Sequence, residues 1–288
     1  MHAPAIPADW PNRGVSQHIL CAPHLWHVQV LGQGPDLLLI HGAGGATHSW
    51  RHVVSALSAR FRVIAVDLPG QGFTVLGARD RCGLDPMTRD LSALIRAQGW
   101  DPVAVVGHSA GAAIALRLAD LHPLRAVVGL NAALGEFDGI AGWLFPAMAR
   151  LLAATPFVAQ VFSGIFATRA KTEKLITSTG STLDKAGLAQ YLTLLRRAEH
   201  VDATLAMMAQ WRLGDLLARL PAMTTPCLFI TASNDRAVPP ETSQRAAGRM
   251  PAAEWLDIPG FGHLLHEEAA ERVTPLILAF LTRAGAIQ

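Results

Sequence analysis

The chain has 288 residues, of which 51% are hydrophobic and only 16% are charged. Soluble proteins usually carry about 25% charged residues, so this composition excludes a disordered chain and predicts a large buried core. The 24 Lys and Arg residues and the 22 Asp and Glu residues leave a net charge of +2. Because no basic run is longer than two residues, we expect no binding to nucleic acid.

The cysteines and the apolar segments point to a cytoplasmic location. Cys21, Cys82 and Cys227 are far apart and lack the spacing of metal ligands, which is typical of reduced thiols and predicts no metal site. Residues 1–13 lack the charged-then-apolar order of a secretory signal. The uncharged run 151–168 is at the short limit for a membrane span. It contains a proline and a glycine, so we expect a buried or interfacial helix there.

Short β-branched or leucine-rich runs alternate with helical patterns, which predicts a mainly parallel sheet covered on both faces. The eight predicted strands are residues 17–21, 25–31, 36–40, 61–66, 102–106, 125–130, 227–231 and 253–258. The predicted helices between and after them are residues 49–59, 85–98, 109–121, 241–249 and 267–283. The first two strands are close enough in sequence to form a hairpin.

Residues 133–223 break this alternation. They contain no convincing strand and are helical by pattern, so we predict a helical cap that is inserted into the sheet domain. Residues 1–132 and 224–288 would then form one discontinuous domain, with 133–223 as the cap above it. Large apolar and aromatic side chains are concentrated in the cap.

The segment Gly107-His108-Ser109-Ala110-Gly111 matches the pattern G-x-S-x-G. A buried strand precedes it and a helix begins directly after it. So tight a turn forces the serine into strained backbone geometry, and the flanking glycines allow the close approach that the turn requires. The serine hydroxyl would lie at the positive end of the helix. An ordinary turn with a helix-capping serine is the alternative, but the context favours Ser109 as a nucleophile.

A serine hydroxyl requires a base that takes its proton, and the base requires an acid that fixes its tautomer. His263 lies in a loop after the last strand, where it could reach the sheet edge. Asp235 directly follows strand 227–231, and the chain order Ser, Asp, His is one that a G-x-S-x-G fold uses. The rival acid position, after strand 125–130, holds Asn131, which cannot carry the charge.

Other titratable residues lie near the same edge of the predicted sheet. His266 is expected on the surface or on a pocket wall. His108 is too close in sequence to the serine to act as its base, and we expect it to contact the substrate. Three carboxylates are nearer to His263 in sequence than Asp235 is, and their positions are typical of the end of a strand or the start of a helix: Asp257, Glu267 and Glu268.

Acyl chemistry also requires donors for a developing oxyanion. The backbone N–H of Ala110, directly after the candidate nucleophile, is one expected donor. The N–H of Ala43 is the other, because its loop leaves a strand next to the nucleophile strand. Gly44 and Gly45 would allow this loop to approach closely. A phosphate-binding turn is the alternative, but the loop lacks both Walker and dinucleotide-binding spacing.

These motifs resemble the α/β-hydrolase superfamily across nearly the whole chain. The H-G oxyanion loop, the D-L-P-G-x-G turn, the nucleophile elbow, the N-D turn and the G-x-G-H loop occur in family order. Gln71 departs from the histidine of many relatives, and we expect it to make no contact with the catalytic set. Because position 109 is a serine, the resemblance argues against epoxide hydrolases and haloalkane dehalogenases, which use a carboxylate nucleophile.

More distinctive segments resemble the magnesium-chelatase accessory proteins of bacteriochlorophyll biosynthesis (the BchO type). Several of them, including two in the predicted cap, lie outside the general hydrolase motifs. The segments are Asp9-Trp10-Pro11-Asn12-Arg13, Ala46-Thr47-His48-Ser49-Trp50-Arg51, Thr179-Gly180-Ser181-Thr182-Leu183-Asp184, Ala206-Met207-Met208-Ala209-Gln210-Trp211 and Asn234-Asp235-Arg236-Ala237-Val238-Pro239-Pro240. This resemblance implies a place in photosynthetic pigment synthesis, and it supplies no reaction.

The sequence therefore predicts a serine hydrolase that cleaves an ester or related acyl bond of a bulky apolar substrate, with no cofactor. We expect substrate contacts from His108, Trp143, Phe162, Met207 and Trp211, although the cap residues could equally form the cap's own core. The resemblance implies a tetrapyrrole as the hydrophobic substrate, association with magnesium chelatase, and peripheral contact with the photosynthetic membrane. The alternative is a non-catalytic tetrapyrrole-binding helper of the chelatase.

Overall fold

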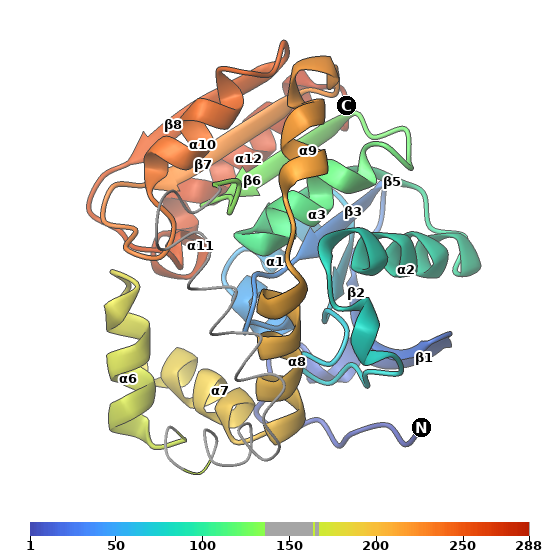
Figure 1. Cartoon of the computed structure of the whole chain (residues 1–288), viewed down its shortest axis with the longest axis vertical. Coiled ribbons are helices and arrows are strands. Elements are labelled where there is room, and N and C mark those ends of the chain that lie inside the picture. The colour runs from blue at the N-terminus through green and yellow to red at the C-terminus, as the bar shows by residue number, and fades with distance from the viewer. Residues whose placement is uncertain (136–163, 165–166, 288) are drawn as a thin grey trace.

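An eight-stranded sheet forms the centre of the computed structural model, which describes residues 1–135, 164 and 167–287 (Figure 1). The strand order is β1-β2-β4-β3-β5-β6-β7-β8. The β1–β2 and β2–β4 pairs are antiparallel, and all other pairs are parallel. The strands are β1 (Ser16–Cys21), β2 (His24–Leu31), β3 (Asp36–Ile40), β4 (Arg62–Val66), β5 (Pro102–His108), β6 (Ala126–Leu130), β7 (Cys227–Ala232) and β8 (Ala253–Ile258). All eight predicted strands are confirmed, each within two residues of its expected bounds.

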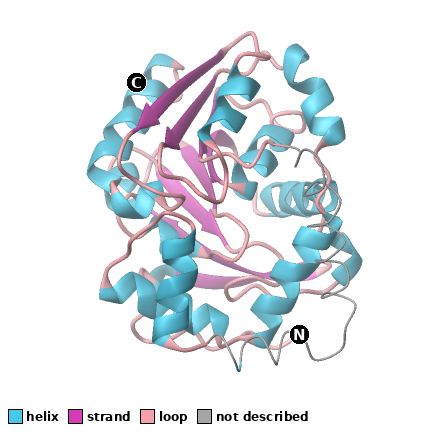
Figure 2. Cartoon of the chain, turned by 60° about the vertical axis from the view of Figure 1, so that its left-hand side comes forward, coloured by secondary structure: helices cyan, strands magenta, loops and turns pink. Residues whose placement is uncertain are grey.

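Helices cover both faces of the sheet, because alternate strand residues are apolar on both sides (Figure 2). Leu38 and Ile40 of β3 belong to the core cluster of α2 (Leu84–Ala97), α3 (Ala110–Leu118) and α10 (Pro240–Ala247). Leu37 and Leu39, on the opposite face of the same strand, belong to the cluster of α1 (Val54–Ser58) and α12 (Ala270–Arg283). The predicted mainly parallel sheet, covered on both faces, is therefore confirmed.

Two predicted helices are each divided into two shorter elements, and the predicted helix 109–121 ends earlier, at Leu118 of α3. Residues 49–59 form a 3-10 turn, Thr47–Trp50, followed by the short α1. The Ser49 hydroxyl donates to the Ala46 carbonyl oxygen at 3.0 Å, a local bond that competes with a regular helical start. The C-terminal helix is divided into α11 (Leu265–Glu268) and α12, because Ala269 between them leaves helical geometry at φ −135° and ψ 42°.

Helices make up most of the described part of residues 133–223. Its helices are α6 (Arg169–Ser178), α7 (Lys185–Leu195), α8 (Ala198–Gln210) and α9 (Gly214–Arg219). In Figure 1, α6, α7 and α8 lie together in the lower part of the view. Leu216 of α9 is buried in the same core cluster as α2 and α3, so the last part of this segment packs on the sheet domain.

The apolar run 151–168 lies almost entirely outside the described residues. Within the residues that are described, no helix is both long enough and apolar enough to cross a membrane.

Candidate active site

Ser109 occupies the turn between β5 and α3. Its backbone has φ 52° and ψ −117°, a region that non-glycine residues avoid unless the surrounding structure enforces it. A Cβ on Gly107 would lie 2.3 Å from the Gly111 carbonyl oxygen, so only glycine fits there. The strained turn predicted for the G-x-S-x-G segment is confirmed.

The Ser109 side chain lies at the N-terminal end of α3 and is largely buried, with 8% of the residue exposed. Among the described residues it makes no side-chain capping bond to the helix, which argues against the capping alternative. Its N–H donates to the Leu130 carbonyl oxygen at 2.9 Å. The ends of β5 and β6 are thereby joined at the serine.

His263 and Asp235 form a hydrogen-bonded pair. The distance between His263 Nδ1 and Asp235 Oδ2 is 2.7 Å, and the carboxylate is fully buried. The other oxygen, Oδ1, accepts from the backbone N–H groups of Ala237 and Val238, both at 2.8 Å. Because the carboxylate is held from both sides, it fixes the imidazole with Nδ1 protonated and leaves Nε2 as the basic nitrogen.

His108 brings this pair next to the serine turn. Its Nε2–H donates to the His263 carbonyl oxygen at 2.8 Å, and the two rings are 4.7 Å apart between centroids. Burial, followed by the neighbouring His266 and His263, lowers the pKa of His108 well below its usual value, so His108 is a neutral donor. Only 3% of His108 is exposed. Its observed contacts include the histidine loop and the ring of His266, and substrate contact by His108 stays a prediction.

Asn131 also holds the loop of His263. Its Nδ2 donates to the carbonyl oxygens of His263 at 2.8 Å and Gly262 at 3.1 Å, while its Oδ1 accepts from the Ala232 N–H at 2.9 Å. Asn131 itself has a positive φ of 45°, which asparagine tolerates better than most residues. Asn131 stands at the rival acid position, where it cannot carry a charge, and its amide instead bridges β7 and the histidine loop.

The loop after β3, which contains the expected oxyanion donor Ala43, lies against the serine. A Cβ on Gly42 would be 2.9 Å from the Ser109 Cβ. His41 connects this loop to the loop after β4. Its Nδ1 donates to the Gly42 carbonyl oxygen at 2.7 Å, and its Nε2 accepts from the Leu68 N–H at 2.9 Å. Burial lowers the pKa of His41, consistent with a neutral ring that donates and accepts.

Gln71 contacts the same loop, at a residue outside the expected catalytic set. Its Oε1 accepts from the Gly44 N–H at 2.8 Å, and its Nε2 donates to Met207 Sδ of α8 at 3.1 Å. Gln71 is fully buried. It therefore connects the residue next to Ala43 with a helix of the predicted cap.

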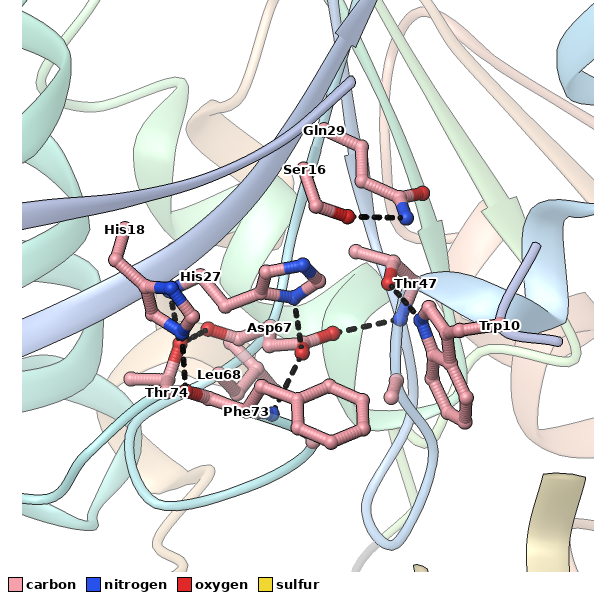
Figure 3. Close-up of polar contacts among 12 residues, drawn as sticks. Trp10, Ser16, His18, His27, Gln29, Thr47, Asp67, Leu68, Phe73 and Thr74 are labelled. Atoms are coloured by element: carbon pink, nitrogen blue, oxygen red, sulfur yellow. Dashed lines mark hydrogen bonds and ion pairs between the residues drawn. The ribbon is translucent and has the colours of Figure 1, made fainter. Parts of the chain in front are cut away.

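Asp67 joins the loops that follow β3 and β4 (Figure 3). Its Oδ1 accepts from the Thr47 N–H at 2.6 Å, and its Oδ2 accepts from His27 Nδ1 at 2.6 Å and the Phe73 N–H at 2.8 Å. Burial alone would raise the pKa of Asp67, but the His27 contact and the hydrogen bonds hold it at about 2. The ionised carboxylate thus fixes the two loops relative to each other.

The four cap residues that were expected to contact the substrate are either packed in the core or outside the described residues. Met207 is only 1% exposed and belongs to the main core cluster, and Trp211 is partly buried against that cluster. Trp143 and Phe162 lie outside the described residues. A role of these four side chains in substrate binding stays a prediction, and for Met207 the observed partners are core residues and Gln71.

The expectation that His266 lies on the surface or on a pocket wall is wrong. The residue is fully buried, and its ring packs between those of Trp50 and His108, at centroid distances of 4.7 and 4.5 Å. Burial lowers the pKa of His266 to about 3. The short helix α11 directs this side chain toward Trp50 and His108. The three-residue spacing between His263 and His266 does not by itself predict that direction.

The model of the α/β hydrolase fold family matches residues 35–270. The chain belongs to the α/β-hydrolase family. It is 47% identical over 279 residues to the magnesium-chelatase 30 kDa subunit of Rhodobacter capsulatus, covering 96% of this chain and 98% of that protein. Both resemblances inferred from the sequence are therefore confirmed.

Other relatives of this α/β-hydrolase include an esterase. The chain is 30% identical to the pimeloyl-[acyl-carrier protein] methyl ester esterase of Nitrosomonas europaea, covering 82% of this chain and 92% of that protein. The crystal structure of an α/β hydrolase fold protein from Burkholderia ambifaria matches with a TM-score of 0.78 and 23% identity, covering 96% of this chain and 100% of that chain. That likeness shows the fold.

Proposed function

We propose that the protein is a serine hydrolase in which Ser109, His263 and Asp235 form the catalytic triad. The observation that supports this most strongly is the 2.7 Å bond between His263 Nδ1 and the buried Asp235 carboxylate. This pair is joined through His108 to the strained turn of Ser109. A strained serine and an oriented histidine–carboxylate pair are the parts that acyl transfer requires.

In the proposed reaction, Ser109 Oγ attacks the acyl carbon of an ester while His263 Nε2 takes the hydroxyl proton. The backbone N–H groups of Ala43 and Ala110 hold the oxyanion of the tetrahedral intermediate. The imidazolium, stabilised by Asp235, gives the proton to the leaving alcohol. Water then attacks the acyl-serine with the same base, which releases the acid and restores Ser109.

For the substrate, we propose an ester or related acyl bond of a bulky apolar molecule, and specifically of a tetrapyrrole in bacteriochlorophyll synthesis. The 47% identity to a protein named magnesium-chelatase 30 kDa subunit supports the pathway and an association with the chelatase. The esterase among the relatives supports the bond type. In this proposal residues 133–223 form a cap over the triad, and the protein works in the cytoplasm and contacts the pigment-bearing membrane peripherally.

The test uses a fluorophosphonate probe, which reacts with activated serines. We expect the wild-type protein to be labelled and the Ser109→Ala variant to remain unlabelled. Ser178→Ala, which changes an exposed serine of α6, is the matched control and should label like the wild type. Absence of labelling in the wild type, while an unrelated serine hydrolase labels normally, would contradict the proposed activity.

A second candidate function is a non-catalytic, tetrapyrrole-binding helper of magnesium chelatase. It is favoured by one observation, the name of the 47% identical relative. The two functions are separated in a bacteriochlorophyll-producing host that lacks its own copy of the gene. If Ser109→Ala restores pigment as well as the wild type does, the helper function is supported. If the variant fails while it is expressed and folded, the enzyme is supported.

A further inference from the structure

The turn between α6 and α7, residues 179–182, contacts both loops that carry the proposed acid and base. The Thr179 carbonyl oxygen accepts from the N–H of Arg236, next to Asp235, at 3.1 Å. The same oxygen accepts from the N–H of His263 at 3.3 Å. One backbone carbonyl in the predicted cap is therefore shared by the acid loop and the histidine loop.

The residues on either side of His263 are held by Ser181 of the turn and by Glu268 of α11, which also binds the turn. The Ser181 hydroxyl oxygen accepts from the Leu264 N–H at 2.8 Å, and Ser181 is almost fully buried. Glu268 of α11 accepts from the Thr182 N–H at 2.8 Å through Oε1 and from the Gly262 N–H at 3.0 Å through Oε2. The backbone of the histidine loop is thus bound at three consecutive N–H groups.

The turn fits between the two loops without room for side chains. A Cβ on Gly180 would lie 1.9 Å from the Asn234 carbonyl oxygen, and one on Gly262 would lie 2.2 Å from the Gly180 carbonyl carbon. Gly180 also has a φ of +86°, which favours glycine. The acid loop, the turn and the histidine loop are therefore in backbone contact, so a displacement of the turn would be transmitted to both loops.

We propose that the 179–182 turn is a positioning element for the triad, which holds the His263 backbone so that Nδ1 meets Asp235 and Nε2 faces Ser109. The proposal rests on the function proposed above. It gives a role to the Thr179–Asp184 segment that was distinctive in the sequence. Support of this kind outside the reacting groups matters because a displacement of about 1 Å can reduce a rate by about 100-fold.

The test removes the Ser181 acceptor with Ser181→Ala. It compares this variant with Ser178→Ala, which changes an exposed serine whose hydroxyl donates to the Leu175 carbonyl oxygen of its own helix. For Ser181→Ala we expect about a tenfold lower kcat for p-nitrophenyl esters with little change in KM. The control should be unchanged. Ser181→Thr, which keeps the hydroxyl, should recover part of the loss. An unchanged kcat in folded Ser181→Ala would overturn the proposal.

A spectroscopic readout separates positioning from general destabilisation and from the proposed activity. The downfield proton resonance of the His263–Asp235 hydrogen bond, assigned by its loss in His263→Gln, should shift or broaden in Ser181→Ala but not in Ser178→Ala. An unshifted resonance would overturn the positioning role. The resonance can be measured even if the wild-type protein shows no esterase activity and no fluorophosphonate labelling. That absence of activity would contradict the proposed hydrolase function, whereas an unshifted resonance would contradict the positioning role.

A second variant covers the case in which Ser181→Ala does not fold. The two carboxylate oxygens of Glu268 accept from the N–H groups of Thr182 and Gly262. Glu268→Gln replaces one of these oxygens with an NH2 group, which cannot accept from the N–H that it faces. Glu271→Gln, at an exposed position of α12, is its matched control. We expect the resonance to shift in Glu268→Gln alone, and identical spectra in the two variants would contradict the proposal.

Discussion

The amide of Asn131 donates to the carbonyl oxygen of His263 at 2.8 Å, from a backbone with positive φ at the end of β6. Asn131→Asp is isosteric and keeps a side chain that tolerates this backbone. It replaces the donor with a carboxylate oxygen that faces two carbonyl oxygens, those of His263 and Gly262. We expect kcat for p-nitrophenyl esters to fall about tenfold or more, and the melting temperature to decrease.

Asn234→Asp is the control for this prediction. It makes the same substitution at an exposed position of the neighbouring acid loop, so it changes the net charge equally without touching the His263 carbonyl. Its kcat should stay close to that of the wild type. Equal activity of Asn131→Asp and Asn234→Asp would show that the Asn131 amide does not position the histidine loop.

Asp235→Asn should reverse the orientation of the imidazole proton. The amide oxygen would remain with the N–H groups of Ala237 and Val238, because both donate to Oδ1. The amide NH2 would then face His263 Nδ1 and stabilise the tautomer that is protonated at Nε2. Since that tautomer cannot accept the serine proton, kcat should fall about 10⁴-fold. Asp80→Asn, at an exposed position, should have no effect, and comparable kcat values for the two variants would contradict the assignment of the acid.

The strands and the position of the serine could be predicted because they depend on local patterns. Apolar runs define strands such as β3, and the G-x-S-x-G pattern demands a strained turn wherever a strand meets a helix directly. The inward direction of His266 and the donors of Asn131 could not be predicted. Both depend on contacts between segments that are more than 100 residues apart in sequence.

The missed residues carried weak signals in the sequence. Asn131 follows β6, which neighbours the strand β5 that leads to Ser109. A polar side chain there would lie at the edge of the sheet that holds the candidate site. Gln71 stands out only as a departure from the histidine of many relatives. Its contact with Gly44 requires the loops after β3 and β4 to meet, which is a consequence of the sheet order and is not apparent from either loop alone.

Gln71→Met should loosen the loop after β3, which carries the proposed oxyanion donor Ala43. Methionine has nearly the length of glutamine but lacks the Oε1 acceptor, so the Gly44 N–H next to Ala43 would lose its partner. Because an oxyanion donor acts mainly on the transition state, we expect kcat to fall about tenfold or less, with KM affected less. In the control, Gln210→Met, the lost Oε1 accepts from the Cys82 N–H and kcat should be retained. Equal kcat values in both variants would contradict the role of Gln71.

Acid should destabilise the folded protein because several buried histidines are held neutral. Burial, followed by the neighbouring His41, lowers the pKa of His200 to about 3, and burial lowers that of His266 to about 3. The unfolded chain binds protons at these residues below about pH 6.5 and the folded chain does not. Their contribution to stability is therefore complete above pH 6.5 and is lost as the pH falls toward 3, by about 1.4 kcal/mol per pH unit for each residue.

Urea unfolding at several pH values between 5 and 7.5 measures this effect. The free energy of unfolding should decrease with falling pH. In His200→Gln, the decrease per pH unit below pH 6.5 should be smaller than in the wild type by the contribution of one buried histidine. The variant loses the acceptor that His200 Nδ1 provides for the Gly72 N–H at 3.0 Å, so its stability at pH 7.5 should also be lower. His2→Gln, at an exposed position, should leave the slope unchanged. If His200→Gln and the wild type have the same slope, His200 is not the buried neutral group that the fold implies.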